Sequence, residues 1–288
     1  MNRLLITAAL LALATSASAQ DVLIRNATVH TATAQGTLQN ADVLVRHGRI
    51  AAIGHGLNAA GAHVVDAAGK PLTPALFAGI NDIGVEEVSG ESATVDSSES
   101  LGSGKDMVVR PEFDVTTAYN PESVLIPVAR VEGYGWTLVS ANPTNGGSLI
   151  GGQGGAFRLD GSLDPIGGRV LFLTLGGDSA NLTGGSRAGQ WMILDQLIDE
   201  ARGRIPVDSK FALLTPAGRS AIAKYFGGGG RVAITIQRAS DIRRLLRWAR
   251  QRNVHIALIG ASEAWKVADE IAAAKVPVFV DALVDLPA

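Results

Sequence analysis

From residue 136 onward, short apolar runs alternate with helical patterns along the chain. The helical patterns cover residues 189–202, 240–250 and 263–274, and the apolar runs cover 136–140, 170–174, 211–214, 232–236, 256–259 and 276–280. Parallel β/α units produce this alternation, because each strand is buried on both faces and each crossover helix on one. The pattern predicts an α/β fold, which we interpret as an incomplete (β/α) TIM-like barrel of about seven strands.

The helical pattern at 240–250 is clearly amphipathic. Apolar residues recur at i, i+3, i+4 and i+7, which places them on one side of a helix with four arginines on the other. These apolar residues are Ile242, Leu245, Leu246 and Ala249. We therefore expect this helix to cover the sheet with its apolar side.

The region before the barrel has a different pattern of predicted secondary structure, in which closely spaced strands are joined by glycine turns. Strands are predicted at 21–30, 41–46, 49–54 and 63–66. We expect a signal peptide over 1–19, a small β-sandwich-type domain over 20–72 and the partial barrel over 73–288.

Residues 1–19 have the pattern of an export signal. A basic start at Arg3 precedes an apolar run from Leu4 to Leu13, and Ala17-Ser18-Ala19 forms a small-x-small cleavage site. The run is about half of the ~20 residues that a membrane-spanning helix needs. We expect a periplasmic or secreted protein without a membrane anchor.

Composition narrows the possible functions. The formal net charge is -2 with only 25 Lys and Arg, and no basic motif is evident, which argues against nucleic-acid binding. The chain has no cysteine, so it forms no disulfide and has no thiol nucleophile. A small-molecule substrate or ligand is the expected partner.

Residues Lys70 to Gly84 resemble the first barrel strand of the amidohydrolase superfamily. That strand typically reads Thr-Pro-Gly-Leu-Ile-Asp-x-His-x-His-x-Gly, and here Ile80 and Asp82 stand at the two histidine positions. Alternate residues of a strand share a face, so we expect Ile80 and Asp82 to point the same way. The segment 22–66 resembles the small β-sandwich domain that precedes amidohydrolase barrels. The segments 119–121, 135–138, 148–154, 238–242 and 263–268 are similar to the exported, imidazolonepropionase-like branch.

In active members, this resemblance implies a hydrolase of non-peptide carbon–nitrogen bonds, of the cyclic amide type, that uses zinc or another divalent metal. The metal lowers the pKa of its bound water, and the resulting hydroxide attacks the carbonyl. The further ligand positions correspond to Arg158 on a middle strand, Thr235 on the fifth, and Ile259 or Gly260 on the sixth. None of these is a usual zinc ligand, so no cofactor is assigned.

The histidines independently disfavour a multi-histidine zinc site. Of five histidines, only His255 lies in the barrel region, where it precedes a strand. Barrel sites gather at the opposite, carboxyl ends of the strands. We expect His255 to be solvated, and no Ser-His-Asp triad is evident.

Asp82 is the one candidate metal ligand. It begins an acidic stretch that also contains Glu86, Glu87, Glu91 and Asp96, and hard cations accept oxygen ligands. A solvated acidic loop is the alternative, because the spacing matches no EF-hand loop.

The glycine-rich segment 145–155 suggests a loop. It lacks the Gly-Lys-Ser/Thr ending of a phosphate-binding loop. We expect Gly152, Gln153 and Arg158 to contact a substrate, with tight turns at the barrel rim as the alternative.

Two functions remain open at this stage. One is an amidohydrolase impaired by its missing metal ligands, and the other is a non-catalytic exported pseudoenzyme that binds a small molecule or a partner. Catalytic residues are not assigned. The chain ends after about the seventh strand, which suggests a truncation or a fragment.

Overall fold

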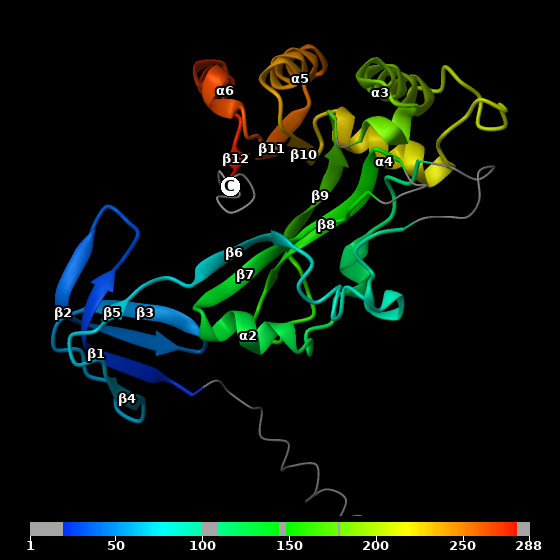
Figure 1. Ribbon diagram of the computed structural model, residues 1–288. Coiled ribbons are helices and arrows are strands. Elements are labelled where there is room, and N and C mark those ends of the chain that lie inside the picture. The colour runs from blue at the N-terminus through cyan, green and yellow to red at the C-terminus, as the bar shows by residue number, and fades with distance from the viewer. Residues whose placement is uncertain (1–19, 100–108, 144–147, 178, 281–288) are drawn as a thin grey trace, which may run out of the picture. The chain divides into compact units, whose positions relative to one another are not determined.

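The computed structural model describes residues 20–99, 109–143, 148–177 and 179–280 (Figure 1). The predicted export signal at 1–19 lies outside these residues. The chain divides into two compact units, Met1–Ala75 and Leu76–Ala288. Within the described ranges, no helix is both long and apolar enough to cross a membrane.

The first unit is a small sheet with strand order β3-β2-β1-β4, and β5 also pairs with β1. β1–β2 and β2–β3 are antiparallel, whereas β4 and β5 run parallel to β1. The strands are β1 (Val22–His30), β2 (Thr37–Arg46), β3 (Arg49–Gly54), β4 (His63–Asp66) and β5 (Pro71–Leu72).

Alternation along β1 and β2 gives this unit its main apolar cluster. Ala27 and Val29 from β1 pack with Ala41 and Val43 from β2, and all four are buried. Asp42, between them, is also buried, and its carboxylate accepts hydrogen bonds from the backbone N–H groups of Asn26 and Leu57. The buried charge is therefore compensated locally.

The second unit contains a seven-stranded sheet with strand order β12-β11-β10-β9-β8-β7-β6. β6 and β7 are parallel, and β9 to β12 are parallel, but β8 runs antiparallel to both of its neighbours. The strands are β6 (Leu76–Asn81), β7 (Tyr134–Val139), β8 (Ile150–Arg158), β9 (Ile166–Thr174), β10 (Arg231–Ile236), β11 (His255–Gly260) and β12 (Val278–Phe279).

The sheet curls so that its two edge strands approach each other. The rings of Phe77 on β6 and Phe279 on β12 have centroids 6.1 Å apart in an edge-to-face arrangement. The predicted fold, an incomplete barrel of about seven strands preceded by a small sheet, is confirmed. The sequence pattern does not predict β8 as a strand, and its antiparallel direction departs from the expected parallel β/α units.

The α-helices of this unit are α2 (Leu125–Val131), α3 (Arg187–Ala201), α4 (Pro216–Phe226), α5 (Ala239–Arg252) and α6 (Ala268–Ala274). Short 3-10 helices lie at η1 (Ser92–Thr94), η2 (Val115–Ala118), η3 (Ala180–Thr183) and η4 (Ala264–Val267). The helix predicted at 263–274 is thus split into η4 and α6.

The strand predicted at 211–214 is wrong. Leu213 and Leu214 donate their backbone N–H groups to the Glu200 carboxylate, both at 2.9 Å, instead of to a sheet. Glu200 is fully buried on α3 and also lies 3.4 Å from the Arg219 guanidinium. The buried Glu200 carboxylate therefore fixes the chain between α3 and α4. A pattern of apolar residues in the sequence does not reveal this contact.

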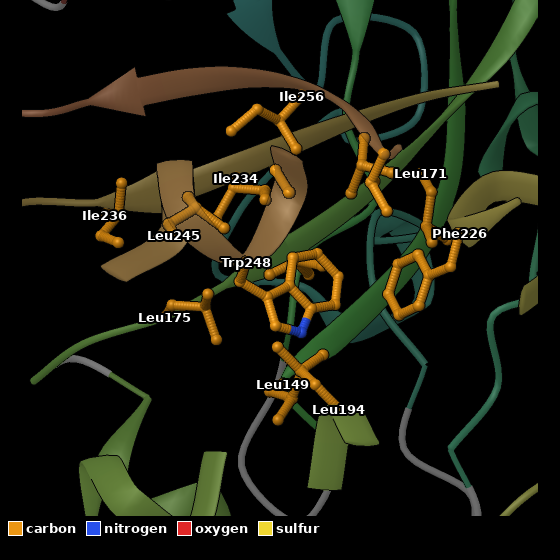
Figure 2. Close-up of a cluster of buried hydrophobic side chains, with 14 of the residues drawn as sticks. Leu149, Leu171, Leu175, Leu194, Phe226, Ile234, Ile236, Leu245, Trp248 and Ile256 are labelled. Carbon is orange, nitrogen blue, oxygen red and sulfur yellow. The ribbon is translucent and has the colours of Figure 1, made fainter. Parts of the chain in front are cut away.

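The main core lies between the parallel strands β9 to β11 and the helices α3, α4 and α5. Along β10, Val232, Ile234 and Ile236 are buried in this cluster, which places Ala233 and Thr235 on the opposite face. Figure 2 shows Trp248 of α5 and Phe226 of α4 in the cluster, with ring centroids 5.3 Å apart. These contacts pack α4 and α5 together against the parallel strands.

A smaller core lies beside β6, β7 and β8. Tyr119 stacks on Phe157 at a centroid distance of 3.8 Å, and Val139 and Ile126 of α2 are buried with them. Much of this core comes from irregular chain rather than from long helices.

The glycines of β8 allow close packing inside the sheet. A Cβ at Gly154 would lie 2.1 Å from the Val139 carbonyl oxygen. Gly152 has φ +126° and would place a Cβ 2.7 Å from the Phe113 carbonyl oxygen. The loop predicted at 145–155 is therefore wrong from residue 150 onward, where the glycines form a strand.

Candidate functional site at the barrel mouth

A pocket of about 180 Å³ opens at the carboxyl ends of the strands. We call it the barrel mouth. It is lined by Ile80, Ser140, Ala141, Asn142, Pro143, Phe172, Leu173, Thr174, Thr235 and Ile259. Residues from β6, β9, β10 and β11 converge here because parallel strands place their carboxyl ends together.

The chain after β7 supplies two of the polar side chains of the barrel mouth, Ser140 and Asn142. Ser140 donates its backbone N–H to the Asn81 carbonyl oxygen at 3.0 Å, which extends the pairing with β6 one residue beyond β7. The Ser140 hydroxyl donates to the Asn142 side-chain oxygen at 3.2 Å. In the described part of the chain, the Thr235 hydroxyl has no hydrogen-bond partner, so it can bind a ligand.

Three of the ligand positions suggested by the sequence meet in this pocket. Ile80, Thr235 and Ile259 line it together, although they are far apart in the sequence. None supplies the imidazole, thiolate or carboxylate that zinc requires. The residues at the barrel mouth therefore do not fit the metal that active amidohydrolases hold.

Outside the barrel mouth, the described residues also lack a set of metal ligands. No group of three or more His, Cys, Asp or Glu side chains within the described ranges is arranged to hold a metal ion. The lining of the barrel mouth contains no charged side chain.

Asp82 does not line the barrel mouth beside Ile80. β6 ends at Asn81, and the chain then turns, with the Asp82 carbonyl oxygen accepting from the N–H groups of Val85 and Glu86 at 2.9 and 3.0 Å. Because Asp82 lies just beyond the end of β6, the expectation that it shares a strand face with Ile80 stays a prediction. Asp82 as a metal ligand stays a prediction.

The Asp82 carboxyl lies beside that of Glu86 instead. A side-chain hydrogen bond to Asp82 raises the pKa of Glu86 above its usual range, with partial burial and the Asp82 charge adding to the effect. The Ser97 hydroxyl donates to Glu86 at 3.5 Å and acts in the opposite direction. The two carboxyls form a local acidic pair at the start of the connection after β6.

Gln153 and Gly152 hold the structure together around β8. Gln153 donates its side-chain amide to the Pro111 carbonyl oxygen at 3.1 Å and accepts from the Tyr225 hydroxyl at 2.7 Å. Its backbone N–H donates to the Phe113 carbonyl oxygen at 2.7 Å. Neither Gln153 nor Gly152 lines the barrel mouth, so their predicted contact with a substrate stays a prediction.

Arg158 lies at the far end of the sheet from the barrel mouth. It is the last residue of β8 and pairs with Trp136, near the amino end of β7. Because β8 is antiparallel, its last residues lie at the amino ends of the parallel strands. Arg158 therefore does not lie at the carboxyl ends of the parallel strands, where the resemblance would place a metal-bridging lysine.

A polar network beside β8 could not be foreseen from the sequence. Arg169 pairs with Asp114 at 2.8 Å, and Asp114 caps η2 by accepting from the Thr116 N–H. Burial, with a contribution from Asp114, raises the pKa of the neighbouring Tyr225 to about 12. These contacts join residues far apart in the chain, and no local motif signals them.

By contrast, the sequence positions of the polar residues in the barrel mouth could have indicated that they lie at a site. Ser140, Thr174 and Thr235 each lie at or near the end of a predicted apolar strand. Polar side chains at the carboxyl ends of barrel strands are candidates for ligand contact.

Comparison with solved structures places this fold among amidohydrolases. An amidohydrolase from Thermotoga maritima MSB8 matches with a TM-score of 0.75 and 21% identity, over 92% of this chain and 71% of that one. A D-hydantoinase from Bacillus sp. AR9 is a weaker match, with a TM-score of 0.31 and 17% identity over 83% of this chain and 56% of that one. The first match shows that this chain has the amidohydrolase fold.

No family model matches the sequence. No curated protein matches it either.

Proposed function

We propose that this chain is an imidazolonepropionase-like amidohydrolase relative that binds a small, uncharged cyclic amide at the barrel mouth and hydrolyses it poorly or not at all. One observation carries the proposal. Ile80, Thr235 and Ile259, which stand where metal ligands are expected, line a single pocket that offers only neutral side chains.

The chemistry of the barrel mouth favours a neutral polar ligand. Hydroxyl and amide groups of Ser140, Asn142 and Thr235 can pair with the N–H and C=O groups of an amide, while Ile80 and Ile259 contact an apolar ring edge. A charged ligand would lose its hydration without gaining a counter-charge. The volume, about 180 Å³, is below the ~300 Å³ at which drug-sized pockets begin, so it suits a single small ring.

Hydrolysis requires more than binding. Attack on an amide carbonyl near neutral pH needs hydroxide, which active relatives obtain by lowering the pKa of a metal-bound water. The barrel mouth has neither the ligands for that metal nor a histidine or carboxylate to act as a general base. We therefore expect the chemical step to be slow even when a ligand binds.

Metal-dependent carbon–nitrogen hydrolysis is the second candidate. It is favoured by the amidohydrolase fold and by the Asp82–Glu86 carboxyl pair directly after β6. Under this candidate, added zinc would increase turnover of a cyclic amide, and Asp82→Asn would abolish the increase.

Calorimetric titration with a hydantoin and an imidazolone tests the first proposal. We expect one of these rings to bind, and Thr235→Val to weaken binding about 5- to 10-fold through loss of one hydrogen bond worth roughly 1 kcal/mol. Thr33→Val, an exposed change in the turn between β1 and β2, should leave binding unchanged. Equal binding by wild type and Thr235→Val, or zinc-stimulated turnover, would contradict the proposal.

A further inference from the structure

A second and larger groove lies at the other end of the strands. It has a volume of about 840 Å³ and lies between α5 and α6, beside the amino ends of β10 and β11. Figure 1 shows α5 and α6 side by side above these strands. Nothing assigned to the barrel mouth involves this groove, since the two pockets share no residue.

The walls of the groove are rich in basic side chains, most of them arginines. Arg243, Arg247 and Arg250 project from successive turns of α5, Arg231 and His255 begin β10 and β11, and Lys275 follows α6. The sole carboxylate in the lining is Glu270, which pairs with Arg243 at 2.6 Å. Arg231, Arg247, Arg250 and Lys275 have no ion-pair partner in the portion of the chain that the structure covers.

Helix-end electrostatics account for only some of these charges. Arg250 and Lys275 lie at helix carboxyl ends, where cations are stabilised by the helix dipole. Arg231 belongs to a strand, and Arg247 stands at i+4 from Arg243, a like-charge spacing that destabilises a helix. The charge cluster therefore exceeds what local structure explains.

The floor of the groove is apolar and partly accessible. Leu246 and Val276 are half-buried and line it, with Ile256 beneath them. α5 has 14 residues and α6 has 7, and residues of both helices line the groove. The groove combines an apolar base with guanidinium groups at its rim.

We propose that this groove binds a small amphiphilic anion, an organic molecule with an apolar body and one carboxylate, sulfate or phosphate group. The volume lies within the ~300–1,000 Å³ of small-molecule pockets. Arginine binds such anions through two parallel N–H···O bonds, and the apolar body would cover the floor.

Calorimetric titration of the full chain with naphthalene-2-sulfonate tests this proposal. We expect one bound sulfonate per chain, and at least 10-fold weaker binding by Arg247→Gln/Arg250→Gln. Arg244→Gln is the matched control, because Arg244 is exposed on the same helix but does not line the groove. Its affinity should lie within 2-fold of wild type, and raised salt should weaken wild-type binding.

Three results would overturn the proposal. They are unchanged affinity in the double variant, equal weakening by Arg244→Gln, and equal binding of the uncharged naphthalene-2-methanol. Tighter binding of a tetraglutamate peptide with the same dependence on Arg247 and Arg250 would replace the small anion with an acidic polypeptide. Thermal unfolding of each variant verifies that the fold is retained.

Discussion

The two halves of the seven-stranded sheet are stabilised by different kinds of core. β9 to β12 pack against long helices in one large cluster of aliphatic and aromatic side chains (Figure 2). β6 to β8 pack against the short helix α2 and irregular chain, and the glycine-rich antiparallel strand β8 joins them to β9. Regular packing thus supports one side of the barrel mouth, and specific long-range contacts support the other.

The same Leu→Ala truncation should lower the free energy of unfolding by different amounts in the two cores. Leu194 of α3 belongs to the large core, and Leu159, just after β8, belongs to the small one; both are essentially fully buried. We expect Leu194→Ala to cost about 3–5 kcal/mol and Leu159→Ala about 2–3 kcal/mol, because irregular chain can collapse further around a cavity. Urea unfolding measures both, and a larger loss for Leu159→Ala would reverse the comparison.

A methyl group added inside β8 tests whether close backbone contact shapes the irregular half. Gly154→Ala would force its Cβ against the Val139 carbonyl oxygen, and we expect a loss of about 1–3 kcal/mol. Gly168→Ala, on β9 with open space around it, is the control and should change stability by less than about 0.5 kcal/mol. Equal changes in unfolding temperature for the two variants would show that close backbone contact at Gly154 does not limit this half of the sheet.

The Tyr225–Gln153 hydrogen bond joins the two halves, so its removal should have a moderate effect. We expect Tyr225→Phe to cost about 1 kcal/mol in the free energy of unfolding. The pKa of Tyr225 in the folded protein, about 12, exceeds its ordinary value of 10.0. The stabilisation that the protonated Tyr225 phenol gives the folded protein is therefore complete below pH 10. It is lost as the pH rises towards 12 and the phenol ionises.

Denaturant midpoints between pH 8 and 12 test this linkage. Tyr225→Phe should reduce the alkaline loss of stability, while Tyr134→Phe, a partly exposed change on β7, should not. An unaltered alkaline profile in Tyr225→Phe would show that this phenol is not a source of the loss.

The smallest effect is expected at the Asp82–Glu86 pair in the irregular half. The pKa of Glu86 is raised in the folded protein, so the protonated Glu86 carboxyl stabilises the fold. This stabilisation is complete below the ordinary pKa of 4.5 and is lost as the pH rises through the folded pKa. Glu86→Gln should therefore stabilise the protein at pH 7 by less than about 1 kcal/mol. The difference should vanish near pH 4, and a destabilised variant at pH 7 would contradict the assignment.

Sequence reasoning succeeded where the structure is periodic. The strands predicted at 170–174, 232–236 and 256–259 follow directly from continuous apolar runs, and the helix Ala239–Arg252 follows from its amphipathic pattern. It failed at β8, because a run of glycines is equally typical of a loop, and at residues 211–214, whose backbone groups bind the buried Glu200.

The candidate site was partly predictable for the same reason. Ile80, Thr235 and Ile259 lie on regular parallel strands, and they meet as expected at the barrel mouth. Arg158 and Asp82 do not lie there, because one ends an antiparallel strand and the other follows a strand that stops one residue earlier. Strand direction and strand ends depend on tertiary contacts that the local sequence does not encode.

Zinc content measured by elemental analysis after dialysis against zinc tests the central claim, that the barrel mouth binds ligands without a metal. We expect well below one zinc per wild-type chain, because Ile80, Thr235 and Ile259 offer no zinc ligand. The triple variant Ile80→His/Thr235→His/Ile259→His should gain close to one zinc. A wild-type chain with one tightly bound zinc would contradict the account and make metal-dependent hydrolysis the leading function.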